Sequence, residues 1–152
     1  MRTVQKLVAV ICNVRSAYNV GSLFRTADAA GIRHLYLCGF TPTPEHPKVA
    51  KTALGAERSV PWEYRAQAGR LLKELKRNGW YLVALEQTRK SKDVFSFEPR
   101  FPAALIVGNE VRGVSKPLLK QCDAIVEIPM RGKKESLNVS VAAGIALYQL
   151  LR

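Results

Sequence analysis

Three polar segments of this chain carry the residue types that could do chemistry, and each follows a short apolar run. NVRSAYNVGSLFR spans 13–25, GNEVRG spans 108–113 and PMRGKKESLN spans 129–138. Together they offer side-chain amides, carboxyls, serine hydroxyls and several cationic groups. Such groups can orient a substrate, move a proton or stabilise a developing negative charge.

The first segment holds an arginine in an unusual setting. Arg25 lies six positions after Asn19, on a stretch otherwise rich in small and apolar residues. This setting predicts a half-buried guanidinium, which needs an anionic partner. Glu110 or Asp28 would be a structural partner, whereas a phosphate or a developing oxyanion would be a functional one. Asn19 is expected to cap the helix that contains Arg25.

The other two segments admit a structural and a functional interpretation. Gly108 precedes Asn109 and Glu110 directly after an apolar run, which indicates a tight turn or a close approach of the backbone to a ligand. The Lys-Ser/Thr pair of a phosphate-binding loop is missing there, so a P-loop NTPase is disfavoured. Ser136 and Asn138 precede a strongly apolar helix, and a simple N-cap at Ser136 is the structural alternative.

The elements that must position these segments alternate between strand and helix. Apolar runs short enough for buried strands lie at 6–12, 34–38, 80–86, 103–108 and 124–129. Helical patterns cover 19–31, 63–79, 115–122 and 139–151. Because the apolar runs are continuous, they predict an α/β fold with a mostly parallel sheet and helices on both faces. Ligands bind such sheets at the carboxyl ends of the strands, so the three polar segments are expected to converge on one crevice.

Composition predicts one domain, 1–152, with a polyanionic partner. The chain has 24 Lys and Arg against 12 Asp and Glu, a formal charge of +12. A domain this basic usually meets nucleic acid, although a solvated basic surface is the structural alternative. We found no internal repeat, low-complexity segment or interdomain linker in the sequence.

The cysteines and the apolar runs predict a soluble cytoplasmic protein without a metal or a membrane. Cys12, Cys38 and Cys122 are widely spaced and form no CxxC pair, which disfavours zinc and a disulfide framework. Reduced, buried thiols are the expected state. No apolar run approaches the ~20 residues that span a bilayer, and no cleavage signal follows the basic start of the chain.

The three polar segments, in this order, resemble the motifs of the SpoU/TrmH branch of the SPOUT superfamily of RNA methyltransferases. The intervening stretch HPKVAKTALGAERSVPW, 46–62, is similar to that family as well, so the resemblance covers essentially the whole chain. It implies a C-terminal trefoil knot, S-adenosylmethionine (AdoMet) as cofactor, a homodimer, and methyl transfer to a ribose 2′-OH of RNA.

The resemblance also implies the site residues. The catalytic positions would be Asn19, Arg25, Glu110, Ser136 and Asn138. The cofactor-binding positions would be Leu85, Gly108, Ile128, Ser136, Leu137 and Asn138. A guanidinium has a pKa above ~12 and is a poor base, so we expect Arg25 to stabilise the 2′-alkoxide or an adjoining phosphate. Glu110 would take the proton or orient Arg25.

The RNA contacts follow from charge in the converging loops. The expected RNA-binding residues are Arg15, Arg131, Lys133 and Lys134. Lys73, Lys76 and Arg77 are interpreted as the solvated side of a helix. Tyr18, Phe40 and Trp62 could stack on bases or could serve packing.

The substrate and its alternatives stay open at this point. The short chain is similar in plan to minimal members of the family that methylate the wobble ribose of tRNA, which favours tRNA over ribosomal RNA. A non-catalytic RNA-binding protein on the same scaffold is the alternative from another class. Methylation of a base is disfavoured by the SLN motif at 136–138.

Overall fold

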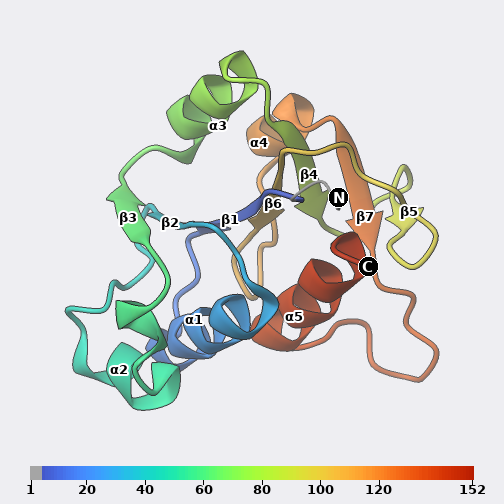
Figure 1. Ribbon diagram of the computed structural model, residues 1–152. Helices are drawn as coiled ribbons and strands as arrows, with labels where there is room; N and C mark the ends of the chain where they lie inside the picture. Colours follow the sequence, from blue (N-terminus) through green and yellow to red (C-terminus); the bar gives the residue numbers. More distant parts are fainter. Residues whose placement is uncertain (1–4) are drawn as a thin grey trace.

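The chain folds into one parallel sheet with helices on both of its faces (Figure 1). The computed structural model describes residues 5–152; residues 1–4, with the basic start of the chain, lie outside the described residues. Among those described, seven strands pair in the order β3-β2-β1-β6-β4-β7-β5, and every neighbouring pair is parallel. The predicted α/β fold class is therefore confirmed.

The strands and helices alternate along most of the chain, as expected. The strands are β1 Leu7–Cys12, β2 Leu35–Cys38, β3 Trp62–Arg65, β4 Tyr81–Leu85, β5 Lys92–Asp93, β6 Ala103–Val107 and β7 Ala124–Glu127. The helices are α1 Ala17–Ala30, α2 Pro47–Ala53, α3 Ala68–Arg77, α4 Lys116–Gln121 and α5 Val139–Leu150, with a short 3-10 helix η1 Ala56–Arg58. All five apolar runs form strands, with ends up to two residues shorter than predicted.

Both faces of the sheet are buried, which explains why the apolar runs are continuous. In β1, Leu7, Ala9 and Ile11 point into one core, whereas Val8, Val10 and Cys12 point into the other. Helices α1, α2 and α5 cover the first face and α3 and α4 cover the second (Figure 1). The strands that the polar segments follow are therefore held in place by helices packed on both faces of the sheet.

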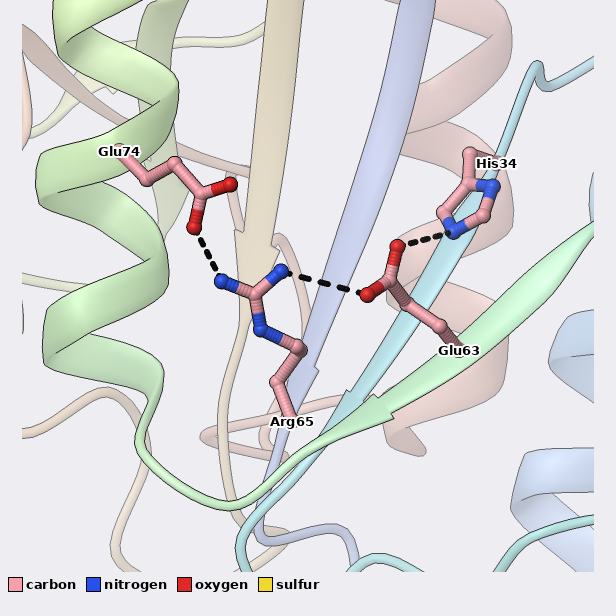
Figure 2. Close-up of polar contacts among 4 residues, drawn as sticks. All are labelled: His34, Glu63, Arg65 and Glu74. Carbon is pink, nitrogen blue, oxygen red and sulfur yellow. Dashed lines mark hydrogen bonds and ion pairs between the residues drawn. The ribbon is translucent and has the colours of Figure 1, made fainter.

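The helix predicted over 63–79 is wrong in its first part, because residues 62–65 form the edge strand β3. Its polar residues are held on the sheet by ion pairs rather than by burial (Figure 2). The Arg65 guanidinium binds the Glu63 carboxylate at 3.2 Å and also the Glu74 carboxylate of α3. His34 Nε2 lies 3.2 Å from Glu63 Oε1. Strand pairing with β2 thus overrides a helical pattern.

Two further predictions about helices are corrected. The N-cap of α1 is Ser16, whose side chain accepts a hydrogen bond from Asn19 N at 3.2 Å, so Asn19 lies in the first turn and is not the cap. Helix α2 was not predicted. It begins at Pro47 and is capped by His46, whose Nδ1 accepts from Lys48 N at 3.1 Å.

The trefoil knot implied by the resemblance stays a prediction. Strand order and register describe which strands are neighbours, but they do not describe how the C-terminal segment threads. The assignment of 1–152 to a single domain stays a prediction in the same way.

Candidate active site

The three polar segments meet through a chain of hydrogen bonds. Glu110 follows β6, Asn19 lies at the start of α1 after β1, and Asn138 precedes α5 after β7. Asn19 Nδ2 donates to Glu110 Oε2 at 3.2 Å, and Asn138 Nδ2 donates to Asn19 Oδ1 at 3.2 Å. Residues 91 and 119 positions apart are thereby joined at one edge of the sheet. The three segments therefore meet at the strand ends, as expected, but only the second and third of them line the pocket at the ends of β4, β6 and β7.

The Glu110 carboxylate clamps the loop after β1 onto the loop after β6. Its Oε1 accepts from Arg15 N at 2.9 Å, and its Oε2 accepts from Ser16 N at 2.9 Å as well as from Asn19. Burial raises the pKa of this carboxyl, but the hydrogen bonds from both backbone amides and from Asn19 outweigh it and lower the pKa overall. Glu110 is therefore ionised at neutral pH, and its oxygens are already engaged.

A pocket of about 300 Å³ opens where β4, β6 and β7 end. Of the expected cofactor-binding residues, the pocket is lined by Leu85, Gly108, Ile128, Ser136 and Leu137. Asn138 is not in the lining, since its amide is turned to Asn19. Of the expected catalytic residues, Glu110 and Ser136 reach this pocket. A volume of this size suits a small organic ligand.

Gly108 has a structural reason to be glycine. A Cβ atom there would lie 2.3 Å from the backbone carbon and oxygen of Gly113, closer than real Cβ contacts. The turn 109–113 is closed by hydrogen bonds in both directions between Asn109 and Gly113, at 3.2 and 2.9 Å. The glycine thus allows this turn to fold back against the strand end beside the pocket.

Several residues of the same pocket were not among the predicted site residues. Glu86 Oε2 accepts from Val114 N at 2.8 Å, and Gln87 Nε2 donates to Glu135 O at 2.9 Å, which ties the loop after β4 to the loop after β7. Glu86 ends the strand predicted over 80–86 and Gln87 follows it, so their position at a strand end was the available signal. Four of the chain's 12 acidic residues line the pocket: Glu86, Glu110, Glu127 and Glu135.

The expectation that Arg25 is half-buried is wrong for this chain, and so is the structural alternative of a pair with Glu110 or Asp28. The side chain is exposed, and among residues 5–152 it makes no hydrogen bond or ion pair with Glu110, Asp28 or any other residue. Arg25 lies six helical positions after Asn19, about 9 Å along the axis and about two thirds of a turn around it. Arg25 is not among the residues that line the pocket of its own chain.

The loop that leads into α5 differs from one detail of the prediction. Asn138 is the N-cap of α5, with its Oδ1 accepting from Ser140 N at 2.9 Å, so the structural alternative of Ser136 as the cap is wrong. Ser136 is exposed and lines the pocket. The expected RNA-binding residues Arg15, Arg131, Lys133 and Lys134 are all exposed on the loops after β1 and β7.

The three aromatic candidates have different environments. Trp62 is half-buried and packs edge-on against Phe24, with ring centroids 6.4 Å apart, which is a packing role. Tyr18 is 46% exposed, and Lys48 Nζ lies 5.8 Å from the centre of its ring. Phe40 is 61% exposed.

Cys12 and Cys122 are not activated nucleophiles. A hydrogen bond with the Cys38 thiol and burial raise the pKa of Cys12, and burial raises the pKa of Cys122 to about 12. Thiols with raised pKa values stay protonated at neutral pH. In the described part of the chain, no three His, Cys, Asp or Glu side chains gather as a metal site would require, and no helix has the length and apolarity to cross a membrane.

Comparison with known proteins identifies the family of this chain. The model of the SpoU rRNA methylase family matches residues 6–148. The chain belongs to the SpoU rRNA methylase family. In this SpoU member, residues of the second and third polar segments line the pocket at the ends of β4, β6 and β7.

One curated relative in this family is the 23S rRNA (guanosine-2′-O-)-methyltransferase RlmB of Ralstonia nicotianae. It is 34% identical to this chain over 146 residues, which cover 96% of this chain and 58% of the relative. A TrmH family protein of Bacillus subtilis, YacO, is 31% identical over 97% of this chain and 59% of its own. The chain thus spans less than two thirds of the length of these curated relatives.

Two solved structures share the SpoU fold closely. AviRb from Streptomyces viridochromogenes, a SpoU methyltransferase solved with the cofactor AdoMet, superposes with a TM-score of 0.87 at 29% identity over 99% of this chain and 58% of its own. A structure described as giving insight into the 2-OH methylation of C/U34 on tRNA has a TM-score of 0.86 at 28% identity, covering 97% of this chain and 95% of its own.

Proposed function

We propose that this protein transfers the methyl group of AdoMet to a ribose 2′-OH of RNA. The observation that carries the proposal is the chain of hydrogen bonds from Glu110 through Asn19 to Asn138, beside a pocket at the strand ends. A domain that only binds RNA has no need to join three loops by hydrogen bonds beside a small-molecule pocket. The net charge of +12 supports a polyanionic substrate.

The pocket lining fits AdoMet. Leu85, Ile128 and Leu137 supply apolar walls, and the pocket is acidic although the chain as a whole is strongly basic. Carboxylates near a cavity favour a cationic ligand, and AdoMet carries a sulfonium. When bound, AdoMet supplies an activated methyl group, so the protein has to position and activate the ribose hydroxyl.

The residues of this chain divide the remaining work. Glu110 holds the loops in place, and its lowered pKa and three engaged donors make it a poor acceptor for the hydroxyl proton. Ser136, exposed in the lining, is free to contact the ligand or the ribose. Arg25 stabilises the negative charge that develops on the ribose oxygen or the charge of the neighbouring phosphate.

Arg25 reaches the reaction only if a second copy of the chain supplies it. The α1–α5 face next to Arg25 is apolar and open, lined by Thr26, Val141, Gly144 and Tyr148. Val141 is 50% exposed and Tyr148 51%. An exposed apolar patch on two helices marks an association surface, and a two-fold dimer would apply the same face of both copies. We therefore propose a homodimer in which each Arg25 completes the partner's pocket.

The RNA substrate we propose is tRNA, at the wobble nucleotide. The support is the solved neighbour described for methylation of C/U34 on tRNA, which this chain covers almost from end to end. Ribosomal RNA is the second candidate, because the family model carries that name and the RlmB relatives are 23S rRNA enzymes.

The test incubates the whole protein with radiolabelled AdoMet and unmodified transcripts of tRNA or of 23S rRNA. Label in tRNA is the expected result, and label only in 23S rRNA would replace the proposed substrate by the second candidate. Retention of both RNAs on a filter without incorporation of label would overturn the enzymatic proposal and favour an RNA-binding protein.

A further inference from the structure

We propose that Phe40 is a stacking platform for a base of the RNA substrate, in a groove separate from the cofactor pocket. This inference rests on the proposed function and adds the place where the RNA chain is read. The groove lies across the 109–113 turn from the pocket, because residues of that turn line both. A nucleotide in the groove would therefore be next to the reacting atoms.

The groove has the size and lining of a nucleotide site. Its volume is about 1020 Å³, and Phe40 and Leu118 give it apolar surface while Asn13, Asn19 and Asn109 give it amides. Planar bases need an apolar surface for their faces and hydrogen-bonding groups for their edges. Both kinds of surface are present within one cavity.

Phe40 is exposed but rigidly held. Its backbone N–H donates to Asn13 Oδ1 at 3.1 Å, and Tyr64 Oη donates to the carbonyl of the preceding residue, Gly39, at 2.8 Å. Gly39 has a φ of +66°, and a Cβ there would lie 1.9 Å from Asn13 Oδ1. The next residue, Thr41, is 3% exposed and donates to Cys38 O at 2.7 Å. A fixed backbone thus presents an unpacked aromatic ring to solvent.

The same hydrogen bonds connect the ring to the candidate active site. Asn13, which holds the Phe40 amide, accepts from Asn109 Nδ2 through its carbonyl at 2.8 Å. Asn109 precedes Glu110 in the turn that walls the pocket. The platform and the pocket are therefore fixed relative to each other, as a site that splays one nucleotide toward the cofactor requires.

Charge favours RNA as the occupant over an apolar peptide. Arg15 and Arg112 are exposed and line the groove, where they can pair with phosphates on either side of a stacked base. The one carboxylate in the lining, Glu110, already accepts three hydrogen bonds. Proteins that bind single-stranded RNA combine aromatic rings, on which bases stack, with cationic side chains such as these arginines.

The experiment compares Phe40→Ala, Phe40→Tyr and Phe95→Ala in steady-state methylation of unmodified tRNA transcripts. Phe95 is a matched control, since it is 42% exposed and follows β5 at the far end of the sheet from β2. Phe40→Ala is expected to lower kcat/KM for RNA by about 5- to 150-fold, mainly through KM, the range that base–aromatic stacking accounts for. Phe40→Tyr should restore most of the loss, and Phe95→Ala should match the wild type.

Further readouts separate failure of this inference from failure of the proposed function. AdoMet affinity and the unfolding temperature should be unchanged in Phe40→Ala, because the ring is exposed and lies outside the cofactor pocket. An RNA bearing 5-iodouridine at the methylated nucleotide or its neighbours should photo-crosslink to Phe40. A wild-type kcat/KM in Phe40→Ala would overturn the platform while leaving the enzyme in place. No methylation by the wild type would overturn the proposed function itself.

Discussion

At the scale of single residues, Glu110 shows how a carboxylate in a candidate active site can have a structural task. It receives two backbone amides of the 13–25 segment and the side chain of Asn19, and these bonds lower its pKa. Glu110 lines the pocket at the strand ends, and its place in the catalytic site stays a prediction. Its environment, rather than its residue type, argues against a role as the base.

Replacing this carboxylate by an amide should loosen the clamp. In Glu110→Gln we expect a lower unfolding temperature and reduced turnover, because hydrogen bonds to a charged acceptor contribute about 1.5–3 kcal/mol each at most, and less where solvent reaches them. The contribution of the ionised Glu110 is full above the ordinary carboxyl pKa of ~4.3 and is lost as pH falls through its lower folded pKa. Thermal melts of both proteins from neutral to acidic pH measure this difference, which should shrink toward acid. A constant difference over that range would contradict the clamp.

Arg25 is a second single residue whose role can be tested, but its proposed role depends on a second copy of the chain. In Arg25→Ala we expect turnover to fall on the order of 100- to 1000-fold, the value of one lost donor to a developing oxyanion. AdoMet affinity and stability should stay at wild-type values, since the side chain is exposed and outside the pocket. Single-turnover methylation and calorimetric titration with AdoMet measure the two. Arg70→Ala, an exposed arginine on α3, is the control; equal rates in both variants would remove Arg25 from the mechanism.

At the scale of elements, burial decided which parts of the fold the sequence could predict. The runs that form β1, β2, β4, β6 and β7 are apolar on both sides because helices cover both faces of the sheet. By contrast, β3 and β5 lie at the two edges and are polar, so only their pairing with β2 and β7 makes them strands. Propensity cannot reveal such pairing.

The exposed apolar side of helix α5 is the surface through which we expect the dimer to form. The helix packs against the sheet with one side, while Val141 and Tyr148 stay exposed on the other. A charge in a closed apolar interface is strongly unfavourable, so Val141→Asp should convert a dimer into a monomer and abolish methyl transfer. AdoMet should still bind, because the residues proposed to line its pocket belong to one chain, whereas the partner's Arg25 is proposed to act on the ribose. Analytical ultracentrifugation gives the mass, with Phe95→Asp as the control; a wild-type monomer that is fully active would contradict the dimer.

At the scale of the whole molecule, the net charge of +12 has a measurable consequence for RNA binding. Each phosphate neutralised contributes about 0.7 to 0.9 to the slope of log affinity against log salt. The double variant Lys133→Ala, Lys134→Ala should reduce that slope by about 1.4 to 1.8. Filter binding of tRNA at several salt concentrations measures the slope. The control pair Lys73→Ala, Arg77→Ala on α3 should leave the slope unchanged. An equal reduction of the slope in the control would contradict RNA binding at the loop after β7.

The exposure of Arg25 could not be predicted from one sequence. Its small and apolar neighbours predicted burial, and the structure of one chain leaves that surface open. Contacts made by a second copy leave the same apolar pattern in a sequence as contacts within one chain. The threading of a knot is invisible for a related reason, because periodicity reports the faces of elements and not their path.

Alkaline hydrolysis of the labelled RNA distinguishes methyl transfer to a ribose oxygen from methyl transfer to a base. Alkali cleaves RNA through the free 2′-OH, so a methylated ribose leaves the label in a resistant dinucleotide. We expect the radioactive methyl group to be recovered in such a dinucleotide. Recovery of the label in mononucleotides, as a methylated base would give, would contradict methyl transfer to the ribose.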